Sequence, residues 1–197
     1  RRPLHDEMAA SERWQKCMEH GDGPRGIVLG QLPGTPQYTG MNLEAVAKDM
    51  GTDAVDALLE VILKNRGCDQ GVYFTMTEQD VRNVMVNPLV MVGSDGGIAL
   101  RGEFVHPRYC GTFPRVLGHY ARDLKLFSME EGVRRMTSLP ASRLGLTRKG
   151  LLRPGMDADM VLFDPGTIAD GNDYEHPTDP PVGIESVWVA GRLAAHR

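Results

Sequence analysis

Asp95 is the residue of this sequence best placed to carry out chemistry. It follows the apolar run Leu89-Val90-Met91-Val92 and lies in the small-residue stretch Ser94-Asp95-Gly96-Gly97. An apolar run bounded by Pro88 and Gly93 is typical of a strand buried on both faces, as in a parallel sheet. A carboxylate just past the carboxyl end of such a strand stands where α/β barrels keep their catalytic groups. The stretch is also ordinary turn composition, so both interpretations stay open at this point.

The residues that could bind a metal are scattered along the sequence. The histidines form no HxH pair and no pair four residues apart, and the cysteines form no CxxC motif. Zinc needs about three or four protein ligands in one place. The spacing therefore indicates surface or hydrogen-bonding histidines, and cysteines that are small core residues or incidental surface thiols. These residues are His5, His20, His106, His119, His176, His196, Cys17, Cys68 and Cys110.

The composition excludes several classes of protein. The 197 residues are 41% hydrophobic and 24% charged, which is typical of a globular protein. The net charge of −4 gives no support for a nucleic-acid partner. No apolar run approaches the roughly 18 residues of a membrane span, and no signal-peptide pattern is present. The odd number of widely spaced cysteines favours a reducing, cytoplasmic location. The first residue is Arg1, which suggests a processed chain, a trimmed one or a piece of something longer.

The elements expected around Asp95 form a compact α/β unit. A strand over 72–76, a helix from Thr77 to about Met85 and a strand over 89–93 follow one another, and we expect the two strands to be parallel. Thr77 and Asp80 resemble a capping box with Asp in place of Glu. Upstream, the patterns predict a helix over 5–19, a buried strand over 27–29, a helix capped by Asn42 and ended by Gly51, and one capped by Thr52 or Asp53.

After Asp95, the predicted secondary structure changes near residue 148 from helices to strands. Thr112 is expected to begin a helix with Pro114 in its first turn, and Ser128 and Glu131 form a capping box for another. Beyond 148 the pattern predicts strands over 158–164 and 184–189, separated by a polar, proline-rich excursion. We therefore expect an α/β region over 1–148 and a small all-β segment over 149–197.

Four stretches resemble the amidohydrolase superfamily. G-L-L-R-P-G-M-D-A-D-M-V-L-F-D (150–164) is similar to a signature of the sandwich that flanks a metal-bearing (β/α)₈ barrel in that superfamily. V-M-V-G-S-D-G (90–96) resembles the turn that carries the aspartate of its eighth strand. H-P-R-Y-C-G-T-F-P-R-V-L-G-H-Y (106–120) narrows the resemblance to N-acyl-D-amino-acid deacylases, and F-T-M-T-E-Q-D-V (74–81) agrees. One departure is Cys110, which stands where the family usually has a tyrosine; here Tyr109 lies one place earlier.

The resemblance implies a fold and an activity. The fold class would be α/β: the C-terminal part of a metal-dependent (β/α)₈ barrel, with its last βα units, followed by a small β-sandwich segment. The activity would be hydrolysis of the amide bond of N-acyl-D-amino acids, with Asp95 as the catalytic base acting through a metal-bound water, and itself a possible ligand. The cofactor would be zinc in the intact enzyme. Because the other ligands are absent from this sequence, we expect a chain that is incomplete for catalysis, holds no stoichiometric zinc alone and self-associates through uncovered barrel edges.

Three further residues are candidates for binding the substrate. Met76 ends a predicted barrel strand and could line the side-chain pocket, although packing is nearly as good an explanation. Arg108 could pair with the substrate carboxylate in bidentate fashion, or it could simply hold a neighbouring carboxylate or carbonyl. His106, which precedes Pro107, could order that loop.

Two other functions remain open on the sequence. One is another amidohydrolase, such as a dihydroorotase-like or hydantoinase-like cyclic amidase, against which the 106–120 block argues. The other is a non-catalytic α/β module for binding or assembly, which the absent metal ligands favour for the isolated chain. The intact Ser94-Asp95-Gly96 turn favours an enzyme for the longer protein.

Overall fold

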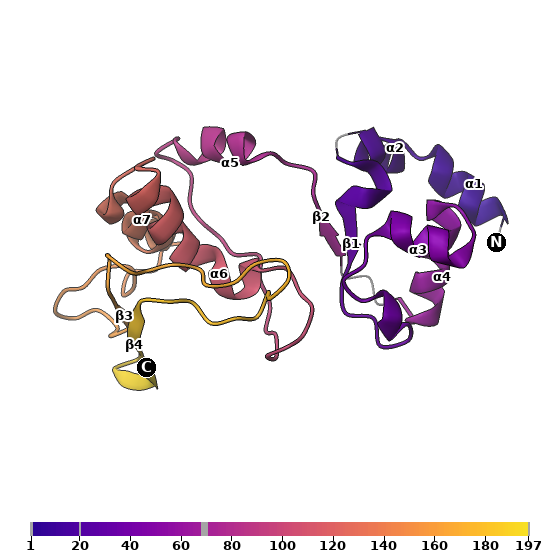
Figure 1. Cartoon of the computed structure of the whole chain (residues 1–197). Coiled ribbons are helices and arrows are strands. Elements are labelled where there is room, and N and C mark those ends of the chain that lie inside the picture. Colours follow the sequence, from indigo (N-terminus) through magenta and orange to yellow (C-terminus); the bar gives the residue numbers. More distant parts are fainter. Residues whose placement is uncertain (1, 20, 68–70, 197) are drawn as a thin grey trace. The chain divides into compact units, whose positions relative to one another are not determined.

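The computed structural model describes residues 2–19, 21–67 and 71–196 (Figure 1). The chain divides into two compact units. The first unit is Arg1–Val81 with Gly102–His106, and the second is Arg82–Arg101 with Pro107–Arg197. The boundary expected near residue 148 falls inside the second unit. In the described part of the chain, no helix combines the length and the apolar character needed to cross a membrane.

The first unit is mostly helical and is built around a short pair of strands. Its hydrophobic core gathers Leu43 and Val46 from one helix, Val61 from the next and Ile27 and Leu29 from the first strand, all almost fully buried. Its elements are α1 (Arg2–Ala10), α2 (Glu12–Glu19), η1 (Gly23–Gly26), β1 (Ile27–Leu29), η2 (Pro36–Tyr38), α3 (Leu43–Met50), α4 (Ala54–Lys64) and β2 (Gly71–Tyr73).

Helix ends in the first unit follow the predicted caps. The Asn42 side chain accepts a hydrogen bond from the Ala45 amide, and the Asp53 side chain accepts from the amides of Val55 and Asp56. Each bond satisfies a donor that the first helical turn leaves open. The single helix expected over 5–19 is divided in two, because the Ser11 hydroxyl accepts from the Trp14 amide and caps α2.

The strands before Asp95 differ from the prediction. β1 and β2 pair antiparallel, with Ile27 opposite Tyr73, so these two expected barrel strands are not parallel neighbours. The segment 89–93 forms no strand and therefore no parallel partner for β2; Leu89 and Met91 are 67% and 42% exposed. A strand needs a neighbour for its backbone groups. Within the described residues only Val92 finds a distant backbone partner, the carbonyl of Arg135.

Helices precede and follow that irregular segment along the chain, and the unit boundary after Val81 divides the first of them. α5 (Glu78–Met85) precedes it, and α6 (Arg108–Arg115), η3 (Val116–Asp123), α7 (Met129–Met136) and α8 (Ser138–Arg143) follow. α6 begins at Arg108, four residues before the predicted start, so Pro114 lies inside the helix rather than in its first turn. Beyond this proline, which has no amide hydrogen to donate, the helix continues as the wider π-helical segment η3. Ser128 caps α7 as predicted, accepting from the Glu131 amide at 3.2 Å.

The chain ends in a three-stranded antiparallel sheet. Its strands are β3 (Met160–Phe163), β4 (Ile184–Val189) and β5 (Arg192–His196), in the order β3-β4-β5. The third strand was not predicted. Ala190 and Gly191 both have positive φ, at 49° and 77°, which is the backbone of a two-residue type I′ hairpin turn. Gly191 was therefore the available signal for β5.

Candidate active site

Asp95 lies in a tight turn with a left-handed backbone. Its φ is +47°, a conformation that few residues other than glycine adopt and that aspartate tolerates better than most. The Ser94 hydroxyl accepts a hydrogen bond from the Gly96 amide at 3.2 Å and closes the turn. The backbone thus directs the Asp95 side chain outward, and 86% of that side chain is exposed.

The two glycines after Asp95 allow the turn to lie directly on the start of α6. A β-carbon on Gly96 would be 3.0 Å from the Tyr109 α-carbon, and one on Gly97 would be 3.1 Å from the Tyr109 ring. Both distances are shorter than ordinary contacts, so a larger residue would push the turn away from the helix. The Ser-Asp-Gly-Gly stretch is therefore more than generic turn composition, because its glycines are fitted to Tyr109.

The close packing brings Asp95 and Arg108 together. Arg108 Nη2 lies 2.8 Å from Asp95 Oδ2, and 42% of the arginine side chain is exposed. An exposed ion pair contributes little to folding, about 0–1 kcal/mol. Chemically, the pair places a proton-accepting carboxylate beside a planar guanidinium that can hold a second carboxylate through two hydrogen bonds.

Met76 and His106 belong to the other compact unit. Met76 lies between β2 and α5 and is 75% exposed, so it does not end a strand as predicted. His106 is half-buried and immediately precedes Pro107. Asp95 and Arg108 are thus the two predicted site residues that a single unit brings together. The contact between the Asp95 turn and Tyr109 was not predicted from the sequence. The pair Gly96-Gly97 was the available signal, because adjacent glycines permit such a close contact.

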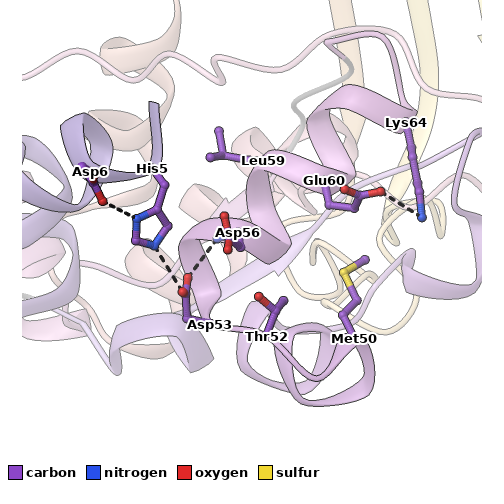
Figure 2. A pocket seen from close by; sticks show the side chains of 9 residues that line it. All are labelled: His5, Asp6, Met50, Thr52, Asp53, Asp56, Leu59, Glu60 and Lys64. Atoms are coloured by element: carbon purple, nitrogen blue, oxygen red, sulfur yellow. Dashed lines mark hydrogen bonds and ion pairs between the residues drawn. The ribbon is translucent and has the colours of Figure 1, made fainter. Parts of the chain in front are cut away.

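Among the described residues, one group of side chains has the donor types of a metal site, and it lies in the first unit. His5, Asp53 and Asp56 place ligand atoms within 4.8 Å of one another. Figure 2 shows this group in a surface pocket lined by α1, the end of α3, α4 and the turn between these last two helices. His5 Nε2 is 3.2 Å from Asp53 Oδ2, and His5 Nδ1 is 3.1 Å from Asp6 Oδ1. The sequence missed this group because His5 and Asp53 are far apart along the chain.

Hydrogen bonds already engage two members of this group, His5 and Asp53. The hydrogen bond to Asp6 raises the pKa of His5 above its usual value, against the opposing effect of burial, and Asp53 adds to the rise. The amide of Asp56 lowers the pKa of the Asp53 carboxyl, since that carboxylate caps α4. In this group Asp53 therefore caps α4, and its contact with His5 links that cap to α1. Among the other histidines and cysteines of the sequence, His20 and Cys68 lie outside the described residues, as does the side chain of Cys17.

Comparison with known proteins identifies relatives for most of the chain. Residues 40–195 match the model of the amidohydrolase family. The chain is 46% identical over 156 residues to a D-aminoacylase of Alcaligenes xylosoxydans xylosoxydans, covering 79% of this chain and 31% of that protein. It is 38% identical over 159 residues to an N-acyl-D-aspartate deacylase of the same organism, covering 81% of this chain and 30% of the relative.

Solved structures agree with these relatives. A crystal structure of D-aminoacylase superposes with a TM-score of 0.77 at 40% identity, over 86% of this chain and 34% of that one. An N-acyl-D-glutamate deacylase from Bordetella bronchiseptica, solved with zinc and a phosphonate inhibitor, gives 0.76 at 37% identity, over 89% and 35%. The chain thus spans about a third of the length of the relatives it matches.

Proposed function

The chain belongs to the amidohydrolase family, and from this membership we propose that it is the C-terminal part of a zinc-dependent N-acyl-D-amino-acid deacylase. The α/β fold follows from the family and its structural neighbours. The relatives named D-aminoacylase, N-acyl-D-aspartate deacylase and N-acyl-D-glutamate deacylase support the substrate class. The reaction would release a free D-amino acid and a carboxylate.

The observation that carries this proposal is the Asp95 turn fitted against α6. Asp95 is exposed and not committed to a helix cap, so its carboxylate is accessible to a water molecule. In the proposed reaction Asp95 removes a proton from the attacking water as the oxygen bonds to the amide carbon. When the carbon–nitrogen bond breaks, the same carboxyl group delivers that proton to the departing amine. A carboxylate held in one place can perform both transfers without leaving the site.

Arg108 is proposed to bind the carboxylate of the substrate. Its guanidinium lies next to Asp95, and its planar fork matches a carboxylate in a way that a lysine ammonium cannot. In the present structure the fork contacts Asp95 itself, so substrate binding would replace or share that contact. His106 and Met76 stay proposed contributors to the binding pocket, His106 through its place before Pro107 and Met76 through its exposed thioether.

The described residues do not by themselves fit a zinc ion beside Asp95. No second histidine, cysteine or carboxylate within the described ranges gathers with Asp95 into a ligand group, whereas zinc needs about three or four ligands. We therefore propose that the remaining ligands come from the part of the enzyme outside this chain. An HxH motif is expected there.

The domain organisation is proposed on the same basis. Residues 1–148 would carry the last part of the (β/α)₈ barrel, and residues 149–197 would add a segment of the β-sandwich. The antiparallel sheet β3-β4-β5 supports the second assignment, because a sandwich is built from antiparallel sheets. The first rests on the family match and on the superposition with D-aminoacylase.

An assay of the full-length gene product tests the proposal. Purified enzyme with zinc is offered N-acetyl-D-amino acids, their L enantiomers and cyclic amides such as dihydroorotate and hydantoin. We expect hydrolysis of the D substrates only. Activity confined to cyclic amides would assign the chain to a different amidohydrolase, and inactivity on every substrate by zinc-loaded, folded protein would favour a binding or assembly module.

A further inference from the structure

One face of the α6–η3 helix carries alternating glycines and arginines that the proposed chemistry does not use. They lie four, three and four residues apart, a spacing that places side chains on the same helical face. All of them fall in or next to the 106–120 block, whose sequence resembles that of the deacylases. The residues of this face are Gly111, Arg115, Gly118 and Arg122.

A single segment, residues 164–172, contacts that face and begins with a turn at residues 165–167; we call it the strap. Arg122 Nη1 donates to the carbonyl oxygens of Gly166 and Ile168 at 3.1 and 2.8 Å. Arg115 Nη1 donates to Asp170 Oδ2 at 2.9 Å. Burial lowers the pKa of the Arg115 guanidinium, but the hydrogen bond and charge of Asp170 outweigh this and raise it. The two arginines thus fasten the strap at two levels of the helix.

The two glycines let the strap lie against the helix backbone. A β-carbon on Gly118 would be 2.2 Å from the carbonyl oxygen of Ile168. A β-carbon on Gly111 would be 2.3 Å from Asn172 Oδ1 and 3.0 Å from the Asp170 β-carbon. No side chain larger than hydrogen fits at either position without moving the strap.

Asn172 joins the strap to the residue before Arg108. Its Nδ2 donates to the carbonyl oxygens of Pro107 and Pro177 at 2.8 and 2.7 Å, which uses both hydrogens of the amide. The Pro107 carbonyl also accepts from the amides of Cys110 and Gly111, so it forms the first hydrogen bonds of α6. Asn172 Oδ1 is buried and, within the described residues, has no hydrogen-bond partner, so the side chain is held through its nitrogen.

We propose that Asn172 is a positioning residue that holds the first turn of α6, and with it Arg108, against the Asp95 turn. Tyr109, which the Asp95 turn contacts through Gly96 and Gly97, lies in the same helical turn. Removing the hydrogen bonds of Asn172 should therefore change the environment of Gly96 and Gly97, which Asn172 does not contact. Any effect on substrate binding rests in addition on the proposed function of Arg108.

Nuclear magnetic resonance of the isotope-labelled 197-residue chain tests this inference. Two variants weaken the contact in different ways: Asn172→Ala removes the donors, and Gly111→Ala inserts a methyl group under the strap. Gly132→Ala is the matched control, because Gly132 lies in α7 of the same unit and its added β-carbon would meet only side chains, at 3.2 Å or more. Hydrogen exchange and chemical shifts are compared at residues 94–97, 108–111, α7 and β4.

Both strap variants should accelerate amide exchange of Cys110 and Gly111 by about tenfold, the change expected for one lost hydrogen bond. They should also move the Gly96 and Gly97 resonances, leaving α7 and β4 unchanged, while the control, which alters α7 itself, leaves residues 94–97, residues 108–111 and β4 alone. The inference is overturned if Gly96 and Gly97 keep their shifts in folded Asn172→Ala, or if exchange rises equally in β4, which would mean general destabilisation.

A kinetic comparison separates this inference from the function it rests on. In the full-length enzyme, Asn172→Ala should raise KM for an N-acetyl-D-amino acid several-fold more than it lowers kcat. An unchanged KM, together with the local spectral changes in the chain, would contradict substrate binding by Arg108 and leave the positioning role of Asn172 intact.

Discussion

Arg108 Nη2 and Asp95 Oδ2 are 2.8 Å apart, although twelve residues of chain lie between them. The contact depends on the glycines that let the Asp95 turn lie on α6 beside Tyr109. A carboxylate and a guanidinium are thus held next to one another at the start of α6. Under the proposed function, Asp95 handles the proton while Arg108 holds the substrate.

Replacing Arg108 with lysine should separate binding from chemistry. Lysine keeps the positive charge but cannot form the two parallel hydrogen bonds of a guanidinium. In the full-length enzyme we expect KM for an N-acetyl-D-amino acid to rise about 10- to 100-fold, with a smaller change in kcat. Stability should change by less than about 1 kcal/mol, because the ion pair is exposed. A variant with wild-type KM would remove Arg108 from the binding site.

Glu131 should make the second unit less stable in acid. Hydrogen bonds from Arg134 and then Arg135 lower the pKa of Glu131 from 4.5 to about 2. A carboxyl whose pKa is lower in the folded state stabilises it above the unfolded pKa, and this contribution is lost as the pH falls towards about 2. Arg135 is buried at 3% exposure, so loss of its partner leaves a buried charge unpaired.

Urea unfolding of wild type and Glu131→Gln at about pH 5 and about pH 3 measures this contribution. We expect the variant to be less stable at the higher pH and the difference between the two proteins to be clearly smaller at the lower one, where part of the contribution is already lost. Glu185→Gln, on the exposed face of β4, is the matched control and should follow wild type throughout. A constant difference between wild type and Glu131→Gln at both pH values would show that Glu131 carries no pH-dependent stability.

The isolated chain should self-associate. Segment 84–100 exposes large apolar side chains, among them Leu89 at 67%, Ile98 at 98% and Leu100 at 69%. Such surfaces are normally covered by other protein, and about two thirds of the length of the D-aminoacylase relative lies outside the matched region. Light scattering over a wide concentration range should show dimers or larger species, and Ile98→Glu with Leu100→Glu should reduce them. Leu63→Glu in α4 is the control, and monomer at all concentrations would refute the prediction.

How far the sequence predicts the structure depends on the range of the interactions. Asn42 and Ser128 were predicted as caps, and Asp53 as one of two candidates with Thr52, because a cap is made within one helical turn. The resemblance to the deacylases is likewise confirmed by the comparisons. These features are encoded by neighbouring residues, so their signals survive in a single sequence.

Contacts between distant residues were not predictable in this way. The run 89–93 is apolar enough for a barrel strand, but it has no neighbouring strand in the described residues and stays irregular. The antiparallel pairing of β1 with β2 depends on residues more than forty positions apart. Asn172 lies in a segment whose sequence indicates only a polar, proline-rich connection. Its hydrogen-bond partner, the Pro107 carbonyl, is sixty-five positions away in the sequence. For Asp95, the turn was predicted, but its fit to Tyr109 was not.

The isolated chain should hold no stoichiometric zinc. Asp95 has no ligand group around it within the described residues, and in the group of His5, Asp53 and Asp56 both ring nitrogens of His5 already lie within hydrogen-bond distance of a carboxylate, that of Asp6 or Asp53. After dialysis against zinc-free buffer, elemental analysis should find well under one zinc per chain, and His5→Ala should match wild type. About one tightly held zinc per chain would contradict this prediction, and its loss in His5→Ala would place the ion in the first unit.

Asp95→Asn in the full-length enzyme tests the central claim most directly. Asparagine preserves the size of the side chain and is itself a good turn former, so the turn should survive, but it cannot accept the proton. Turnover of an N-acetyl-D-amino acid and bound zinc are measured on the same preparation, with Asp157→Asn as a control, an aspartate of the second unit that pairs with Arg148. We predict that turnover falls by about 10²- to 10⁴-fold while zinc content falls far less. Retention of more than about a tenth of wild-type turnover would remove Asp95 from the mechanism.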